Sequence, residues 1–501
     1  MSGIPAVYAV TAAAILWYVI STLAAWYRLR KFPGPTLAKF SYLWAYFAMR
    51  TGRNQFIMAE QQEKYGKIMR LGPNELMIYD PETLWYINGA RSTYRRGGWY
   101  DSAKFDPYGH NILSEPDTVT HDKRKAKVMS GYAGKGNVNI EQKVDSQLAL
   151  LVDVLRKNHL QEGDNIVDFS KLIRFFQVDL VTLVGSSEPW GDLPTETDKF
   201  DFISLADGMV PFLDSFMMVP YLRNFFASSF FLTLAGPKAT DKKGMGRFMG
   251  LIKGMVEKRF GEDSTKSIEQ GEQGDMLTEW IKHGLSRREC EIELAIQVPT
   301  GTETTTSGIR AIMLYLLTSP NAYRKLQEEI TAGIRDGRIS SPISQEQAKQ
   351  LPYLQAVIYE GLRMVPPAVA GFPKKVPAGG DTICGEFVPA GTDIFVNVYT
   401  MLRNKEVFGK DADTFRPERF LVCDPAKKAE LIKTVDLIFG HGRWLCPGKT
   451  LAWFELNKVF VELLRNFDFQ VVNPESPWTC KAYISILIED FWIRVTERRE
   501  Y

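Results

Sequence analysis

A glycine-rich stretch near the C-terminal end, Phe439–Gly448, holds the residue best suited to chemistry, Cys446. An apolar run leads into the stretch and a helical pattern over residues 450–467 leaves it, so Cys446 is predicted to lie where a helix begins. The N–H groups and the dipole at a helix start favour a thiolate, which serves as a metal ligand or as a nucleophile. Gly442 and Gly448 allow the backbone to fold tightly around the sulfur, which favours a metal ligand.

A second stretch pairs an acid with an alcohol. Ser286–Glu289 reads as a capping box, and the helical pattern that follows continues to Leu317. Inside it, Pro299 and the glycine and threonines around it predict that the helix kinks or opens, because proline lacks an N–H and threonine hydroxyls bind backbone carbonyls. Glu303 and Thr304 would then stand side by side. A purely structural break in the helix is the alternative.

The first stretch resembles the haem-binding loop of the cytochrome P450 superfamily, Phe-x-x-Gly-x-Arg-x-Cys-x-Gly. The resemblance implies that Cys446 is the axial thiolate ligand of haem iron; a buried free cysteine is the alternative. The loop departs from the pattern at Trp444, which stands where the family has a basic residue. Its indole N–H can still donate to a haem propionate, and Arg443 beside it is expected to supply the charge.

The acid and alcohol stretch resembles the Ala/Gly-Gly-x-Asp/Glu-Thr-Thr motif of the same family, with Thr300 at the small first position. The resemblance implies that Thr304 steadies bound dioxygen and its water and that Glu303 gates the supply of protons. Two further motifs of the family, Glu-x-x-Arg and Pro-Glu-Arg-Phe, imply that Glu360, Arg363 and Arg419 lock the core beneath the haem loop.

Three more basic residues are expected to contact haem propionates by resemblance. His121 and Lys125 lie four apart and so on one helical face, where the family commonly has Trp and Arg. Lys374 follows an extended stretch that skirts the haem in the family. A solvated basic helix face is the alternative for the first two.

The N-terminal residues 4–26 form an apolar, charge-free run of a length that can span a bilayer. Basic residues at 28, 30 and 31 follow, and the positive-inside rule then leaves the rest of the chain in the cytosol. We expect residues 1–31 to be an uncleaved single-pass anchor in the endoplasmic reticulum membrane, with a cleaved signal peptide as the alternative. Phe32–Pro35 is expected to form a stiff hinge to a haem-thiolate monooxygenase domain over residues 32–501.

Composition excludes several classes of protein. The 501 residues carry a net charge of +2, so no overall field favours nucleic acid. The five cysteines show no C-x-x-C spacing, which argues against a disulfide framework or a zinc site. The resemblance implies a mainly α fold with a small β lobe.

The function expected is that of a membrane-anchored haem monooxygenase which hydroxylates or demethylates an apolar small molecule, with fungal pisatin demethylases and benzoate hydroxylases as the nearest groups. Electrons would come from a separate NADPH-cytochrome P450 reductase, with cytochrome b5 as a second donor, since no flavin module follows the haem loop. A haem-thiolate isomerase or dehydratase and a non-catalytic membrane haem protein are the alternatives.

The apolar segment 209–234 is expected to dip into the membrane interface or to form a wall of the substrate pocket. Residues 262–275 are expected to form a flexible surface loop.

Overall fold

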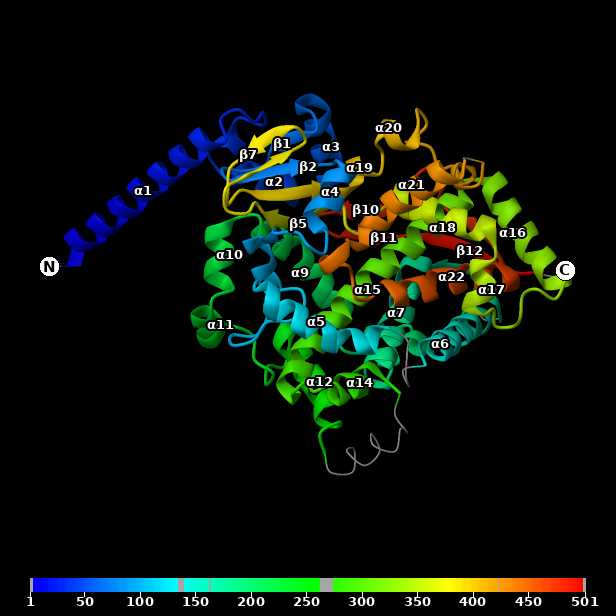
Figure 1. Ribbon diagram of the computed structural model, residues 1–501. Coiled ribbons are helices and arrows are strands. Elements are labelled where there is room, and N and C mark those ends of the chain that lie inside the picture. Colours follow the sequence, from blue (N-terminus) through cyan, green and yellow to red (C-terminus); the bar gives the residue numbers. More distant parts are fainter. Residues whose placement is uncertain (1–2, 134–138, 162–163, 262–273, 423, 499–501) are drawn as a thin grey trace.

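The structure is a computed structural model that describes residues 3–133, 139–161, 164–261, 274–422 and 424–498. Helices make up most of the body, and one sheet, built from residues 68–96 and 370–397, lies toward the side from which the N-terminal helix extends (Figure 1). The predicted mainly α architecture with a small β lobe is therefore confirmed.

A long helix, α15 (Arg287–Leu317), runs through the body, and its 31 residues span about 46 Å. The predicted capping box is present, with Ser286 and Glu289 binding each other's backbone N–H groups. The helix remains continuous through Pro299, so it does not open there as predicted. Threonine hydroxyls nevertheless bind the carbonyl one turn back, as expected: Thr300 binds Ile296 O and Thr304 binds Thr300 O.

Several helices pack against α15. They are α7 (Phe169–Ser186), α12 (Gly244–Glu257), α14 (Met276–Lys282), α16 (Pro320–Arg335), α18 (Pro352–Met364) and α22 (Lys449–Asn466). In α7, 16 residues are buried, because apolar side chains recur around the helix and polar ones such as Asp179 bind backbone N–H groups. This packing fixes the depth of α15 in the body.

The remaining helices of the described chain surround this core. They are α1 (Gly3–Arg28), α2 (Leu43–Arg50), α3 (Asn54–Tyr65), α4 (Pro81–Asn88), α5 (Thr118–Tyr132), α6 (Ile140–Val154), α8 (Asp192–Thr195), α9 (Phe202–Met217), α10 (Pro220–Phe226), α11 (Ser229–Ala235), α17 (Gln345–Lys349), α19 (Val398–Met401), α20 (Lys405–Phe408) and α21 (Pro425–Asp436).

The largest sheet has the strand order β1-β2-β8-β5-β3. Its strands are β1 (Ile68–Arg70), β2 (Glu75–Ile78), β8 (Asp393–Asn397), β5 (Ala370–Lys375) and β3 (Arg95–Arg96). The first two form an antiparallel hairpin with Ile68 opposite Ile78, which the sequence predicts because Gly72 and Pro73 separate two short runs, residues 68–71 and 75–80. The β5 register shifts between Gly371 and Lys374, and Phe372 there has a φ of 53°, a left-handed conformation that is rare for an aromatic residue.

Smaller sheets complete the lobe. They are β4-β12-β9, from β4 (Ile166–Asp168), β12 (Trp492–Glu497) and β9 (Phe467–Val471); β10-β11, from β10 (Thr479–Ala482) and β11 (Ile486–Glu489); and β6-β7, from β6 (Asp381–Ile383) and β7 (Glu386–Val388).

The N-terminal helix α1 extends away from the body (Figure 1). Within the described residues, no helix combines the length and the apolarity needed to cross a membrane, so the predicted spanning anchor is not supported. The C-terminal end of α1 is docked on the body, because the buried Arg70 side chain donates to Ala25 O and Trp26 O. The backbone N–H of Arg70 also donates to Pro33 O, so the proline-rich segment lies against β1.

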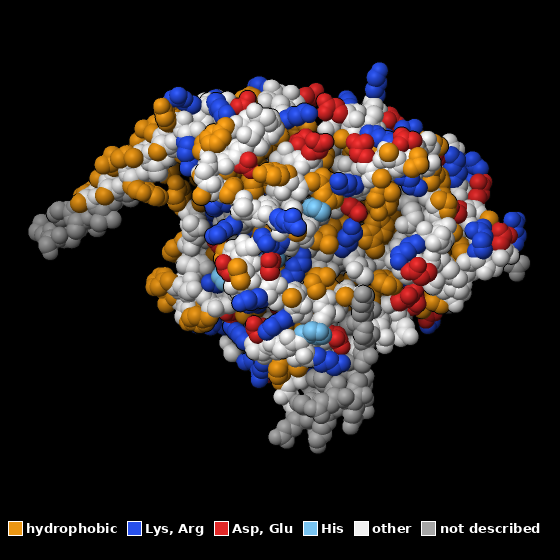
Figure 2. All heavy atoms as spheres, in the orientation of Figure 1, with side chains coloured by type: hydrophobic (Ala, Val, Ile, Leu, Met, Phe, Trp, Pro, Cys, Tyr) orange, Lys and Arg blue, Asp and Glu red, His pale blue; other side chains and the backbone are white. Residues whose placement is uncertain are grey.

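The apolar segment 209–234 is helical, falling on α9, α10 and α11. Several of its large apolar side chains are exposed, among them Phe212, Phe225, Phe230 and Leu234. Figure 2 shows orange side chains over α1 and over the region of α10 and α11. Most of the predicted flexible loop 262–275 lies outside the described residues.

Candidate functional site

The cysteine loop lies between α21 and α22 and closes on itself. The Cys446 N–H donates to Phe439 O at 2.7 Å, which brings the two ends of the loop together. Gly440 and Gly442 have φ values of 74° and 56°, and a Cβ on Gly442 would lie 2.5 Å from Asn88 O at the end of α4. Glycine is therefore required at Gly442 both for its conformation and for the close approach of α4.

The Cys446 side chain is accessible on one side and surrounded by the loop on the other. Burial in the loop raises the pKa of the Cys446 thiol, although the N–H groups of Gly448 and Lys449 and the Lys125 ammonium act to lower it. The net direction is opposite to the sequence-based expectation that the helix start lowers this pKa. A bound metal cation would reverse it, because a coordinating thiol is deprotonated.

Two basic side chains, the buried Lys374 and the half-buried Arg96, face each other beside the loop. Antiparallel pairing of β3 with β5 places Arg96 directly opposite Lys374. Lys374 is 2% exposed and donates to the Tyr100 hydroxyl at 2.7 Å, while Arg96 donates to the carbonyls of Ile112 and Glu115. Neither forms an ion pair with a carboxylate among the described residues, and burial together with the Arg96 charge holds the pKa of Lys374 well below its usual value. The arrangement therefore favours an anion between or beside them.

Trp444 completes this cradle. Its ring lies 4.7 Å from the Arg96 guanidinium and 4.9 Å from the Lys374 ammonium, and its indole Nε1–H is buried without a partner. A buried donor without a partner costs free energy unless a ligand accepts from it. Two cations and one free donor near a cysteine sulfur fit the carboxylates of a haem whose iron binds that sulfur.

The other predicted propionate residues have different surroundings. His121 is buried, with its ring 4.7 Å from the Trp444 ring, and burial together with the Arg96 charge lowers its pKa to about 4. Lys125 donates to the carbonyls of Arg443 and Leu445, so it holds the cysteine loop by its backbone. The Arg443 guanidinium pairs with Asp122 at 3.0 Å on the surface. The structure thus gathers His121, Lys374 and Trp444 and turns Arg443 elsewhere.

The acid of α15 is held by a residue that the sequence did not reveal. Arg174 of α7 donates from Nε and Nη2 to Glu303 Oε1 at 2.9 and 2.7 Å, and both side chains are buried. Arg174 Nη2 also pairs with Asp207 of α9 at 2.7 Å, whereas Glu303 Oε2 is buried without a partner. Glu303 is therefore bound through one oxygen and available through the other. Thr304, next in the chain, is half-buried.

The expected charge lock beneath the loop is present. Glu360 accepts from Arg363 at 2.7 and 2.8 Å and from Arg419 at 2.9 Å, and all three side chains are at most 3% exposed. Arg363 and Arg419 also donate to loop carbonyls, including Ala412 O and Phe408 O. The network ties α18 to the segment that precedes α21 and so supports the cysteine loop.

Sequence reasoning missed Arg96, Tyr100, Arg174 and Asp207. For Arg96 the signal was available, since strand alternation in the run from Tyr94 to Arg96 places Arg95 and Arg96 on opposite faces. For Arg174 no local signal exists, because its partners are 129 and 33 residues away in the chain.

The site combines three features: an accessible cysteine in a closed glycine loop, a cluster of basic residues suited to carboxylates, and a long helix that carries an acid and an alcohol. This combination is typical of a haem-thiolate enzyme. The family model for cytochrome P450 matches residues 33–489. Cytochrome P450 monooxygenase ABA1 of Pyricularia oryzae is 39% identical over 98% of this chain and 96% of its own. Cytochrome P450 monooxygenase aba1 of Botryotinia fuckeliana is 40% identical over 94% and 92%, and pisatin demethylase of Fusarium vanettenii is 28% identical over 93% and 88%.

The chain belongs to the cytochrome P450 family. It is a cytochrome P450 monooxygenase whose cofactor is haem.

Proposed function

We propose that this enzyme inserts one atom of dioxygen into an apolar small molecule of fungal secondary metabolism or detoxification, by hydroxylation or demethylation. The observation that carries the proposal is that Arg96 and Lys374 lie against the ring of Trp444, whose Nε1 has no partner and which stands two residues before Cys446 in the glycine loop. Cys446 would hold the iron, and the other three would hold the propionates. Bound haem would supply the activation of dioxygen and the transfer of one oxygen atom to the substrate.

The residues around the cradle have supporting roles in this proposal. Lys125 keeps the cysteine loop in place through its two carbonyl contacts. The buried His121 ring packs against Trp444; burial and the Arg96 charge lower its pKa, and a propionate beside it would raise that pKa, as it would for Lys374. Arg443 contributes to the outer surface through Asp122.

Glu303 and Thr304 would manage protons on the distal side. The Thr304 hydroxyl donates its hydrogen to Thr300 O at 2.8 Å, which leaves its oxygen free to accept from a water or a substrate group. Glu303 Oε2, buried and without a partner, is the atom that would take up a proton and pass it on. Arg174 holds the other oxygen and so fixes the direction of Oε2.

The substrate class rests on the side chains near β5 and on the relatives. Trp99, Phe372 and Tyr483 belong to one buried or half-buried apolar cluster, which suits an apolar molecule. Tyr108, in contrast, is 79% exposed and unsuited to wall a pocket. The relative named pisatin demethylase supports demethylation as one outcome, and the relatives named monooxygenases favour dioxygen chemistry over isomerisation.

Electrons would come from NADPH-cytochrome P450 reductase, with cytochrome b5 as a second donor. The enzyme would be attached to the endoplasmic reticulum membrane, with its catalytic body in the cytosol. Exposed aliphatic and aromatic side chains on α1, such as Ile15, Leu16 and Trp17, support attachment to lipid, because three successive residues cover more than one face of the helix. Exposed Phe225 and Phe230 would lie at the same surface.

The test uses the purified full-length protein with the reductase. The ferric haem spectrum is titrated with aromatic acids, isoflavonoids, terpenoids and polyketides, and a low-spin to high-spin shift identifies a substrate. With that substrate, Thr304→Ala should lower product per NADPH severalfold and raise peroxide, whereas Thr302→Ala, whose buried hydroxyl binds Val298 O, should not. Unchanged coupling in Thr304→Ala would refute the role of the hydroxyl, and a protein without a thiolate haem spectrum would refute the function.

A further inference from the structure

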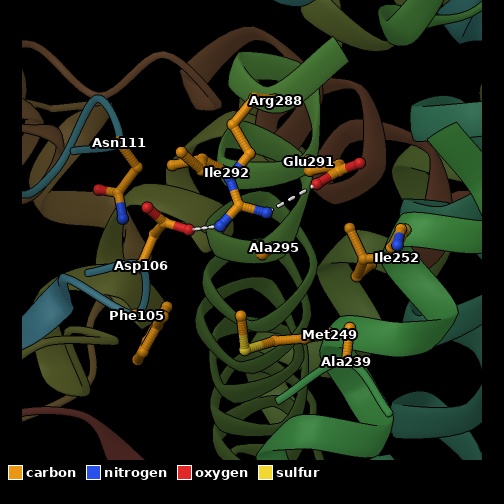
Figure 3. A pocket seen from close by; sticks show the side chains of 11 residues that line it. Phe105, Asp106, Asn111, Ala239, Met249, Ile252, Arg288, Glu291, Ile292 and Ala295 are labelled. Atoms are coloured by element: carbon orange, nitrogen blue, oxygen red, sulfur yellow. Dashed lines mark hydrogen bonds and ion pairs between the residues drawn. The ribbon is translucent and has the colours of Figure 1, made fainter. Parts of the chain in front are cut away.

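The charged groups at the small cavity of Figure 3 are already paired. The cavity lies between the loop 105–111, α12 and α15, and its volume of about 40 Å³ is enough for two or three water molecules. Figure 3 shows the Arg288 guanidinium between the carboxylates of Asp106 and Glu291, and it pairs with both. Lys253, which also lines the cavity, pairs with Glu257 at 3.9 Å. The apolar cluster around Trp99 is different, because polar groups there lack partners.

Trp99 carries a buried donor that has no acceptor. It lies in the short 3₁₀ helix Gly98–Ala103 and is 5% exposed, and its Nε1–H has no partner among the described residues. Its ring lies 5.1 Å from the Tyr100 ring and 5.4 Å from the Phe372 ring. A buried N–H without an acceptor costs free energy, which an oxygen of a ligand would recover.

Asp214 of α9 carries a buried carboxylate with one free oxygen. The residue is 7% exposed, and its Oδ2 accepts from the Ile484 N–H at 2.7 Å and from the Ser485 N–H at 3.4 Å. Among the described residues, no donor reaches its other oxygen, Oδ1, and no cation pairs with it. Burial raises the pKa of Asp214 to about 7. A hydroxyl that donates to Oδ1 would stabilise the carboxylate.

The donor and the acceptor both border the turn between β10 and β11. A Cβ on Gly371 of β5 would lie 3.4 Å from Ile484 Cγ2 and 3.5 Å from Trp99 Cζ2, so the Trp99 ring and the Ile484 side chain lie against the same glycine. Ile484 is also the residue whose N–H binds Asp214. Trp99 and Asp214 are therefore placed around one short stretch of β5 and the turn.

Direct contacts connect this stretch to the basic cluster beside the cysteine loop. Tyr100, next to Trp99 in the chain, accepts from Lys374 at 2.7 Å, and the Lys374 ammonium lies 4.9 Å from the Trp444 ring. Phe372, whose ring contacts Trp99, precedes Lys374 by two residues in β5. A substrate beside a haem that this cluster holds would thus be close to Trp99 and the turn.

We propose that Trp99 and Asp214 bind a hydroxyl group of the substrate, so that the enzyme selects an apolar molecule that carries an alcohol or a phenol. The inference rests on the proposed function, which puts the substrate beside the haem. A hydroxyl suits both groups, because its oxygen accepts from Trp99 Nε1 and its hydrogen goes to Asp214 Oδ1. A hydrocarbon would leave both groups unpaired, and a carboxylate would meet the like charge of Asp214. Sites built to bind a hydroxyl discriminate strongly for this reason.

The experiment compares ligands that share a skeleton and differ in one group. The first set is 2-ethylnaphthalene, 2-(2-naphthyl)ethanol and 2-naphthylacetic acid, and the second is farnesene, farnesol and farnesoic acid. Each ligand displaces 1-phenylimidazole from the iron of the haem-loaded enzyme, which gives its Kd. Trp99→Phe keeps an aromatic ring and removes the N–H, so it should raise the Kd of the alcohols about threefold to tenfold and leave the Kd of the hydrocarbons unchanged.

Asp214→Asn should reverse the preference. Asparagine keeps an oxygen for the Ile484 N–H but puts an amide donor in place of the free acceptor. The ratio of the acid's Kd to the alcohol's Kd should therefore fall about tenfold, because the carboxylate loses a like charge and gains a donor. A purely structural role of Asp214 would instead weaken all three ligands of a set alike.

Trp280→Phe is the matched control. It removes the same N–H from a buried tryptophan, but this N–H donates to Val128 O at 2.9 Å, so the Kd ratios should equal those of the unmodified enzyme. The hydroxyl site is overturned if Trp99→Phe and Asp214→Asn leave the ratios unchanged, or if no alcohol of either set binds the unmodified enzyme. Failure of the proposed function is separate, because it shows as a missing thiolate haem spectrum or a lack of substrate oxidation in the unmodified enzyme.

Discussion

Replacing Glu360 with glutamine tests whether the buried charge lock holds the cysteine loop in place. Glu360 is 0% exposed and accepts from Arg363 and Arg419, which are 0% and 3% exposed, and from the Arg416 N–H. Glutamine keeps the volume but removes the only carboxylate that both guanidinium groups share among the described residues. Arg363 then lacks its counter-charge and Arg419 keeps only Asp411, at 3.3 Å, and breaking such a buried pair costs about 3–5 kcal/mol.

That loss is a large fraction of the stability of a folded protein, about 5–15 kcal/mol. We expect Glu360→Gln to lower the urea midpoint of the haem-loaded enzyme strongly and to convert much of it to a form that lacks the thiolate-type carbon monoxide spectrum. Circular dichroism measures the loss of the fold, and the carbon monoxide spectrum measures whether Cys446 still binds the iron.

Glu418→Gln is the control for Glu360→Gln. Glu418 lies in the same segment and binds Lys325 and Tyr353, but its side chain is 30% exposed, so its loss should cost at most about 1 kcal/mol. Equal midpoints for the two variants, or a normal spectrum in Glu360→Gln, would show that the buried network does not support the loop.

Three more outcomes are expected. Burial raises the pKa of Glu455 to about 8, so the folded state keeps a proton that the unfolded state releases above about pH 4.5. The free energy of unfolding therefore falls as pH rises from about 4.5 to 8. Glu455→Gln should remove about 1.4 kcal/mol per pH unit from this slope, as measured by urea unfolding, and an unchanged slope would contradict the assignment. Burial and the Arg96 charge hold the pKa of Lys374 low, and a propionate would raise it. The protein should therefore take up a proton when it binds haem, and the Lys374→Leu variant should not. Calorimetry in two buffers of different ionisation enthalpy measures this uptake. Asp207→Asn leaves the Arg174 guanidinium to Glu303 alone, so product per NADPH should fall severalfold and the solvent isotope effect should rise. In a Glu303→Gln background, Asp207→Asn should cause neither change.

Features that depend on neighbours in the chain were predictable. The capping box at Ser286, the hairpin beginning at Ile68 and the back-bonding threonines follow from residues at most ten positions apart. The sequence predicted that α15 kinks or opens at Pro299, and the helix does not open there. Threonine hydroxyls take carbonyls along the helix, and the helix is packed along its length against α7, so tertiary contacts keep it helical where local propensity alone favours a break.

The N-terminal helix shows a limit of a different kind. Apolar length predicted that α1 exists but could not predict where it lies, because its position depends on contacts with residues far along the chain. Tyr221 of α10 packs its ring 5.8 Å from Trp17 and 6.0 Å from Tyr18, and Arg70 binds the last carbonyls of α1. Long-range contacts therefore hold the predicted hinge at Phe32–Pro35 against the body, and these contacts could not be predicted from the sequence.

The cradle around Arg96 explains why the propionate residues were the least predictable part of the site. Charge and helix spacing drew attention to His121, Lys125 and Arg443, yet what matters for an anion is a buried cation without a carboxylate partner, and burial and partners are set by strand pairing. The pairing of β3 with β5 puts Arg96 opposite the buried Lys374, and under the proposed function the haem propionates supply the anion that both lack. A buried basic group without a carboxylate partner among the described residues is therefore a stronger sign of an anion site than the number of basic residues on a helix, because a solvated lysine needs no partner.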